Sequence, residues 1–150
     1  MNPDPDFKIS ATPYLCVHDA AAALDFYAKA FGAVETLRMA EPSGKIGHAE
    51  FHIGGAQFML ASEFPEIGVL SPKTLGGSPV LIVLDLPDVD AFAATATAAG
   101  AAVTREIKDQ FYGRRSGQIT DPFGHRWDIG TTIEEVSQEE LTRRAAAMRG

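Results

Sequence analysis

Cysteine is nearly absent from this sequence, and long apolar runs are absent altogether. Cys16 is the only cysteine among 150 residues, so the chain has neither a disulfide framework nor a cysteine-based zinc site, which fits a reducing compartment. No apolar segment is long enough to span a bilayer, and the amino-terminal residues show no basic stretch followed by an apolar run. These absences predict a cytoplasmic protein.

Positive charge is also scarce. The chain has 13 lysines and arginines against 20 aspartates and glutamates, for a formal net charge of -7. Nucleic acids and anionic membranes are bound by clustered lysine and arginine, so neither is expected as a partner. No glycine-rich nucleotide loop follows a predicted strand, so nothing in the residues supports a nucleotide-like methyl donor. The hydrophobic share of 45% suits one globular domain or two small fused modules.

Apolar periodicity predicts the order strand, helix and three strands, and this order occurs twice. In the first copy Asp19 offers an N-cap to an alanine-rich helix and Gly32 ends it, and Asp88 and Gly100 do the same in the second copy. A segment rich in proline and glycine separates the copies. The predicted boundaries are a flexible lead-in at 1–10, a first βαβββ module at 11–62, a linker at 63–78, a second βαβββ module at 79–130 and a C-terminal helix at 133–149.

The hairpin at residues 118–129 resembles that of a known family. Its sequence, Gln-Ile-Thr-Asp-Pro-Phe-Gly-His-Arg-Trp-Asp-Ile, places a tight turn between two alternating strands. It resembles the last hairpin of the vicinal oxygen chelate superfamily, which includes glyoxalase I, bleomycin-resistance proteins and extradiol dioxygenases. The PhnB-like branch is most similar, through Thr-Pro-Tyr-Leu at 12–15, His-Ala-Glu at 48–50 and Gly-Gln-Ile-Thr-Asp at 117–121.

The resemblance implies an α+β fold in which the two βαβββ modules form an eight-stranded open barrel with the ligand in its concave face. Homodimers are common in the superfamily, so a homodimer is expected. In the enzymes of the superfamily the concave face also holds a divalent metal. Position by position, the metal ligands fall at Thr12, Met59, Pro79 and Asp128, and only Asp128 is able to bind a hard cation. The expectation is therefore no metal and no other cofactor, with a divalent metal as the alternative.

Strand alternation sorts the predicted strands into two faces without reference to any family. One face is predicted to pack under the helices and contains Leu15, Val17, Phe51, Ile53, Phe58, Leu60, Val80, Ile82, Leu84, Trp127 and Ile129. The opposite face mixes polar and apolar side chains, which is typical of a small-molecule pocket. The predicted ligand-binding residues include two aromatics, Phe111 and Tyr112, that precede the last hairpin. The full set is Tyr14, His48, Glu50, Met59, Phe111, Tyr112, Arg114, Gln118, Arg126 and Asp128.

Arginines and aromatics in this set indicate the chemistry of the ligand. Arg114, Arg115 and Arg126 offer a bidentate site for a carboxylate or phosphate, and Phe111 with Tyr112 are suited to stacking on a planar ring. An equally weighted alternative is that the arginines pair with surface acids and that the aromatics cover the barrel mouth or a dimer interface. The predicted partner is a small organic molecule, anionic or aromatic.

His48, Glu50 and His52 lie on one face of one predicted strand. Neighbouring same-face residues are about 6.8 Å apart, so His48 and His52 are roughly 13 Å apart and do not share one ion. At most two of the three side chains are able to chelate one ion, as a substitute metal site. Over that site, the favoured interpretation is a partly solvated strand face on which Glu50 pairs with a histidine. The other candidate is a catalytic role, in which Glu50 or His48 acts as general acid or base.

The function that the sequence predicts is small-molecule binding without the superfamily metal. The alternative is a metal-dependent lyase, isomerase or dioxygenase, and a third hypothesis is a dimerisation or regulatory module without a ligand. The missing metal ligands favour the first function, and the superfamily likeness favours the second. Whether the chain catalyses a reaction is left open by the sequence.

Overall fold

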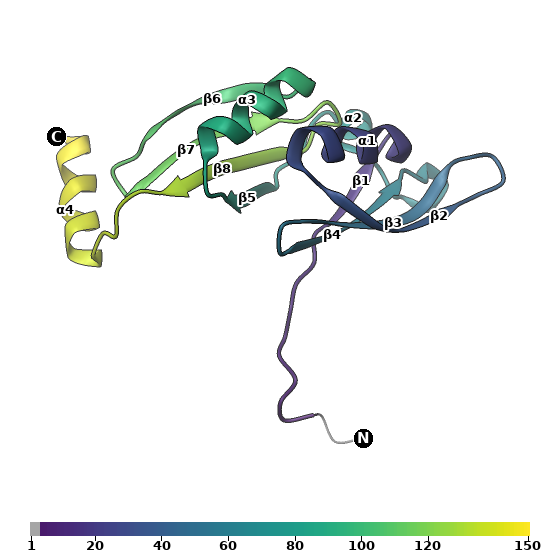
Figure 1. Cartoon of the computed structure of the whole chain (residues 1–150), viewed down its shortest axis with the longest axis horizontal. Coiled ribbons are helices and arrows are strands. Elements are labelled where there is room, and N and C mark those ends of the chain that lie inside the picture. Colours follow the sequence, from purple (N-terminus) through teal and green to yellow (C-terminus); the bar gives the residue numbers. More distant parts are fainter. Residues whose placement is uncertain (1–3) are drawn as a thin grey trace.

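The structure, a computed structural model, describes residues 4–150 and has the predicted α+β class (Figure 1). The first module contains β1 (Tyr14–Val17), α1 (Ala20–Phe31), β2 (Val34–Ala40), β3 (Ile46–Ile53) and β4 (Ala56–Ser62). The second contains β5 (Leu81–Asp85), α3 (Val89–Ala99), β6 (Ala102–Asp109), β7 (Arg114–Thr120) and β8 (Arg126–Thr132). Between them lie a 3-10 turn, η1 (Pro65–Ile67), and a short helix, α2 (Pro72–Leu75), and the C-terminal helix is α4 (Gln138–Arg149). The first three residues of the predicted lead-in, 1–3, lie outside the described residues, and 4–10 contain no helix or strand.

Each module forms its own mixed four-stranded sheet. The strand orders are β1-β4-β3-β2 and β5-β8-β7-β6. β1 pairs in parallel with β4 and β5 with β8, whereas the other neighbours are antiparallel. β1 and β5 are the inner edges of the two sheets, and within residues 4–150 no ladder of hydrogen bonds joins them, so the sheets are not closed into a barrel (Figure 1).

The core lies between the sheets and the two long helices, α1 and α3, which pack against each other on the same side (Figure 1). The Phe31 ring stacks on Phe92 with 5.1 Å between centroids, and the buried Trp127 meets Phe31 edge-on at 4.9 Å. Aromatic side chains from both modules therefore share one core. Alternation predicted this face correctly except at Val80, which is 60% exposed because β5 begins one residue later, at Leu81.

The carboxylate of Asp121, in the turn between β7 and β8, ties the two modules together inside this core. Its Oδ2 accepts hydrogen bonds from Tyr27 Oη at 2.6 Å and from Trp127 Nε1 at 2.9 Å. Its Oδ1 accepts from the backbone amides of Phe123 at 2.8 Å and His125 at 3.0 Å. Burial first, and then the negative charge of Asp121, raises the pKa of the Tyr27 phenol well above its ordinary value. Tyr27 therefore stays a neutral hydrogen-bond donor.

The segment between the modules contacts both of them. Ser71 is fully buried and its hydroxyl donates to the carboxylate of Glu63, to which Thr74 Oγ1 also donates at 2.7 Å. At the other side, Gly124 of the β7–β8 turn packs on Pro72, because a Cβ added at Gly124 would lie only 2.7 Å from the Pro72 Cβ. This segment therefore has a defined path over the end of the second sheet.

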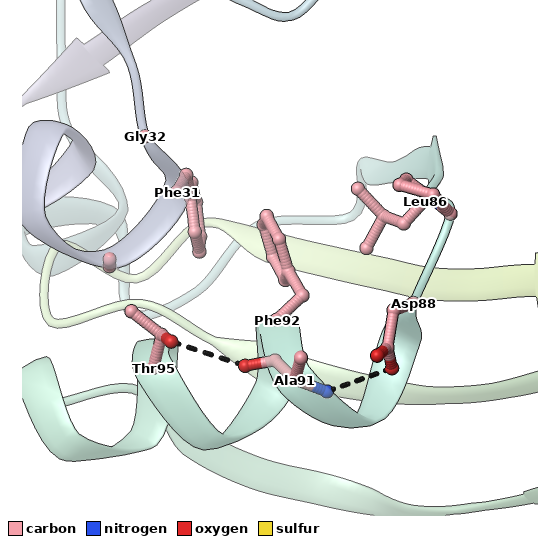
Figure 2. A pocket seen from close by; sticks show the side chains of 9 residues that line it. Phe31, Gly32, Leu86, Asp88, Ala91, Phe92 and Thr95 are labelled. Carbon is pink, nitrogen blue, oxygen red and sulfur yellow. Dashed lines mark hydrogen bonds between the residues drawn. The ribbon is translucent and has the colours of Figure 1, made fainter.

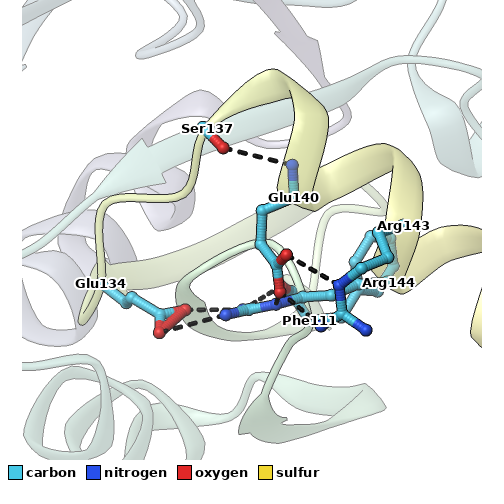
Figure 3. Close-up of polar contacts among 6 residues, drawn as sticks. All are labelled: Phe111, Glu134, Ser137, Glu140, Arg143 and Arg144. Carbon is cyan, nitrogen blue, oxygen red and sulfur yellow. Dashed lines mark hydrogen bonds and ion pairs between the residues drawn. The ribbon is translucent and has the colours of Figure 1, made fainter.

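Arg144 joins α4 to the residues before it, and further ion pairs run within the helix (Figure 3). None of its residues is buried. Arg144 Nη1 donates to the carbonyl of Phe111 at 2.9 Å and to Glu134 Oε1 at 2.6 Å, and Arg144 Nε donates to Glu140 Oε1 at 2.9 Å. Arg143 adds two further hydrogen bonds to Glu140. Of the helices formed by residues 4–150, none is both long and apolar enough to cross a membrane.

Acid is expected to destabilise α4. Hydrogen bonds from Arg143 and then Arg144 lower the pKa of Glu140 from its ordinary 4.5 to about 2. A carboxyl group with a depressed folded-state pKa stabilises the fold fully above its unfolded pKa, and this contribution is lost as the pH falls through the folded value. Hydrogen exchange should show α4 protected above pH 4.5 and progressively exposed as the pH approaches 2. Glu140→Gln should reduce this pH dependence without abolishing it, because Arg144 also lowers the pKa of Glu134, and protection of wild-type α4 that persists unchanged at pH 2 would contradict the prediction.

Candidate functional site

The first sheet carries a polar network on the face that points away from the helices. Tyr14 of β1 and Glu50 of β3 are both in register with Met59 of the intervening strand β4. Tyr14 Oη lies 2.8 Å from His48 Nδ1, and His48 Nε2 lies 3.4 Å from Glu50 Oε2. The structure therefore brings together all four predicted site residues of the first module.

The second sheet carries a separate network whose charges neutralise each other. Arg114 donates to the carboxylate of Asp128 and to the Leu84 carbonyl, the latter at 2.8 Å. Gln118 Nε2 lies 3.5 Å from the second carboxylate oxygen of Asp128. The buried Nε of Arg114 makes no hydrogen bond, although Asp85 Oδ1 is 3.3 Å away, and we interpret that contact as a charge interaction. Arg114 and Asp128 are thus paired with each other, and both side chains are largely buried.

A cavity of about 620 Å³ lies between the two inner edge strands. Its walls are mostly apolar, with a phenol and an imidazole as the polar ring systems. Backbone of β1 and β5 forms two sides, and the end of the linker forms a third. The lining residues are Ala11, Thr12, Pro13, Tyr14, Leu15, Ser78, Val80, Leu81, Ile82, Val83 and His125. The predicted residue Tyr14 is the member of this lining that also belongs to the polar network of the first sheet.

His125 closes one side of this cavity and was not predicted as a site residue. Its Nε2 lies 2.8 Å from the carbonyl oxygen of Cys16, so the hairpin turn of the second module is attached to β1 of the first. The two residues are 109 positions apart, and no local pattern signals such a contact.

Burial first, and then the charge of Glu63, raises the pKa of the Cys16 thiol, which makes Cys16 a poor nucleophile.

Arg126 and Lys73 line a second hollow, of about 500 Å³, which adjoins the first at Ser78. Arg126 is in register with Leu81, which lines the larger cavity. Neither cation takes part in any of the ion pairs formed among residues 4–150. Lys73 was missed by sequence reasoning because the path of the linker is not readable from its composition.

The other predicted ligand-binding residues lie elsewhere. Phe111 and Tyr112 form an edge-on pair, 5.2 Å between centroids, in the turn before β7. That turn is at the opposite end of the second sheet from Arg126, about 20 Å away along the strands. Arg115 pairs with Asp90 of α3 on the helix side of the sheet. The aromatics and the three arginines therefore do not form one site.

The positions that correspond to the superfamily's metal ligands do not fit a hard divalent cation. Thr12 and Pro79 are exposed, Pro79 has no side-chain donor, and Met59 offers only a thioether. Asp128 is the one carboxylate among them, and the guanidinium of Arg114 occupies it. Within residues 4–150, no three side chains of histidine, cysteine, aspartate or glutamate are grouped so as to hold a metal ion.

A groove of about 360 Å³ lies between α1 and α3, and the two polar side chains in its lining hydrogen-bond to α3 (Figure 2). Its apolar walls include Phe31 and Phe92. The Asp88 carboxylate accepts from the amide of Ala91 at 3.1 Å as an N-cap, and the Thr95 hydroxyl donates to the Ala91 carbonyl at 3.1 Å. Both polar side chains therefore form hydrogen bonds to the backbone of α3. We interpret the groove as the place where the helices of the two modules pack together.

Comparisons with known proteins agree with this architecture. Residues 9–129 match the family model of the Glyoxalase/Bleomycin resistance protein/Dioxygenase superfamily. The uncharacterized protein Rv0887c of Mycobacterium tuberculosis is 44% identical over 133 residues, which cover 87% of this chain and 78% of that protein. The structure of the Arabidopsis thaliana gene product At5g48480 is similar with a TM-score of 0.65 at 27% identity, covering 82% of this chain and 98% of that one. TioX from Micromonospora sp. ML1 is similar with a TM-score of 0.64 at 25% identity, covering 83% and 100% of the two chains.

Proposed function

Because the chain belongs to the glyoxalase/bleomycin resistance protein/dioxygenase superfamily, we propose that it binds a small organic anion with an aromatic or apolar body. The cavity between β1 and β5 is the single observation that carries this proposal. Its volume of about 620 Å³ lies within the range of small-molecule sites. Within the superfamily, the motifs at 12–15, 48–50 and 117–121 support a place in the PhnB-like branch.

Apolar surface in the cavity supports an aromatic or apolar ligand body. Tyr14, Val80 and Val83 are all exposed, although they lie on or beside the two inner edge strands. A ligand that removes about 100 Å² of apolar surface from water gains roughly 2.5 kcal/mol. A planar ring between β1 and β5 would also meet the ring of Tyr14, which favours stacked or edge-on packing.

Arg126 supports an anionic group on the ligand. It is in register with Leu81 of the cavity, lines the adjoining hollow, and has no carboxylate partner among residues 4–150. A guanidinium binds a carboxylate or phosphate through two parallel hydrogen bonds. Lys73, across the adjoining hollow, adds a second positive charge. What distinguishes these two cations is that they line the same hollow, which adjoins the cavity at Ser78.

We propose further that binding does not use the superfamily metal. The support is the donor set: one carboxylate already paired with Arg114, together with a threonine, a methionine and a proline. A catalytic metal of this type needs about three protein ligands and an open position. The metal-dependent lyase, isomerase or dioxygenase is therefore the less favoured function.

A homodimer is the form we propose for the binding protein. Leu37 and Met39 on β2 and Val103 on β6 are exposed on the outer edge strands. A second copy that packed against these strands would bury them. Light scattering on the preparation used for ligand binding should give twice the chain mass of 16.0 kDa, and the mass of a single chain would contradict the dimer.

Binding of 2-naphthoate tests the proposed function. This planar carboxylate should raise the melting temperature, whereas nickel, zinc, manganese and iron(II) should not. Arg126→Gln should weaken the affinity about tenfold or more, because it removes a charged hydrogen-bond pair. Arg105→Gln, an exposed arginine of β6, is the matched control and should bind normally.

The neutral analogue 2-naphthamide separates the two parts of the proposal. It should bind more weakly than 2-naphthoate to the wild type and equally to wild type and Arg126→Gln. Stabilisation by a metal alone, with neither aromatic probe bound, would reject the proposal in favour of the metalloenzyme.

A further inference from the structure

Tyr14, His48 and Glu50 form a continuous chain of hydrogen-bonding groups on the open face of the first sheet, at 2.8 and 3.4 Å. The members come from two strands, β1 and β3, that are separated by β4. Their exposure differs along the chain: the side chains of His48 and Glu50 are 25% and 24% exposed, whereas Tyr14 is 54% exposed. The phenol is therefore the accessible end.

The charge of Glu50 sets the direction of these hydrogen bonds. An ionised carboxylate only accepts, so the proton between His48 and Glu50 belongs to His48 Nε2. In a neutral imidazole the other ring nitrogen then accepts, and His48 Nδ1 takes the phenolic hydrogen of Tyr14. Hydroxyl, imidazole and carboxylate in this order are the arrangement by which a histidine withdraws a proton from an attacking or proton-accepting oxygen.

The accessible end of this chain reaches the cavity in which the proposed function places the ligand, because Tyr14 lines the space between β1 and β5. We propose that Tyr14 is the catalytic base of a metal-free proton transfer, with His48 and Glu50 as its positioning residues. The proposal rests on the proposed function, since it uses the same bound anion. The substrate class is a carbon acid: an aromatic or apolar carboxylate with a C–H bond beside a carbonyl group.

The transfer balances without any other reactant. As the C–H bond of the substrate breaks, its proton passes to Tyr14 Oη and the phenolic proton passes to His48 Nδ1. The electron pair of the C–H bond enters the carbonyl group and gives an enolate. Glu50 stabilises the imidazolium that forms. Return of a proton to the substrate restores Tyr14 and His48 and yields either the tautomer or the isotopically exchanged substrate.

Exchange of phenylpyruvate in D2O tests the proposal, because its methylene signal in the proton NMR spectrum disappears as exchange proceeds. The wild-type protein should accelerate exchange beyond the buffer rate. Tyr14→Phe should lower the protein-dependent rate about 100-fold or more while the Kd of phenylpyruvate changes less than about threefold. His48→Gln and Glu50→Gln should each lower the rate at least about tenfold, again at an unchanged Kd. A loss of rate without a loss of binding is not expected of residues that only support the fold.

His52→Gln is the matched control. His52 lies on the same strand as His48, but its Nδ1 bonds to the Gly54 carbonyl at 3.0 Å and takes no part in the chain. Its exchange rate should equal that of the wild type. Binding of phenylpyruvate without faster exchange, or equal exchange by Tyr14→Phe, overturns the relay and leaves the binding function standing. Absence of binding by both phenylpyruvate and 2-naphthoate overturns the relay and the binding function together.

Discussion

Asp121→Ala is expected to lower the free energy of unfolding by about 3 to 5 kcal/mol. Asp121 is only 3% exposed, and its two oxygens satisfy a phenol, an indole and two backbone amides. Alanine would leave the Tyr27 hydroxyl and the Trp127 N–H without acceptors in the core, where an unsatisfied donor costs about 1 to 3 kcal/mol. The loss would also release the contact between α1 and the last hairpin.

Urea denaturation, followed by the fluorescence of the single tryptophan, measures this loss. Asp19→Ala is the matched control, because Asp19 is an exposed N-cap that accepts one hydrogen bond, from Ala22, and its loss should be about 1 kcal/mol. Asp121→Asn should fall between the two, since an amide keeps an acceptor for the turn but presents N–H groups to two buried donors. Equal losses for Asp19→Ala and Asp121→Ala would show that Asp121 is only a turn cap.

Gly113→Ala is expected to cost about 3 kcal/mol or more. Gly113 has φ +85 in the turn before β7, and its carbonyl accepts from the amides of Ile133 and Glu134. An added Cβ would overlap the Glu134 carbonyl oxygen and lie 2.9 Å from Val136 Cγ2. The backbone that leads into α4 would have to move, so α4 should become sensitive to proteolysis in this variant.

Gly44→Ala separates backbone strain from this overlap. Gly44 has a similar φ of +90, and a Cβ there meets nothing within 4 Å. Its cost should be about 1 kcal/mol, from strain alone. If the two alanine variants unfolded at the same urea concentration, close packing of the β6–β7 turn on residues 133–136 would not contribute to stability.

The fold was predictable because its signals are local. Asp19 and Asp88 each precede an apolar helix that a glycine ends, and both aspartates are N-caps in the structure. Asp-Pro-Phe-Gly at 121–124 marks the last turn in the same way. No local pattern predicts the hydrogen bond between Tyr27 and Asp121, because the two residues are 94 positions apart. The sequence also did not predict where β5 begins. Val80 follows a loop, so no alternating residues precede it to mark the boundary.

Contacts between residues of one strand in the candidate site could be predicted from the sequence. Contacts between residues of different strands could not. Alternation puts His48 and Glu50 on one face, and they do interact. The phenol that completes their chain comes from β1, which reaches β3 only through the parallel pairing with β4. Alternation gave Arg114 and Arg126 the same face, but which of them finds a carboxylate depends on the register between β7 and β8. Lys73 and His125 depended on the path of a loop and a turn.

The pairing of the first strand of each module with its last strand bears on the order in which the chain acquires structure during synthesis. β1 finds no partner until residues 56–62 have left the ribosome. The Tyr27 hydroxyl gains its acceptor later still, because Asp121 is synthesised 94 residues after Tyr27. A nascent first module also lacks the rings of Phe123 and Trp127 that pack on Tyr27, so its core is incomplete. We therefore expect the tandem repeat to fold as one cooperative unit, in which translation of the last hairpin completes both halves.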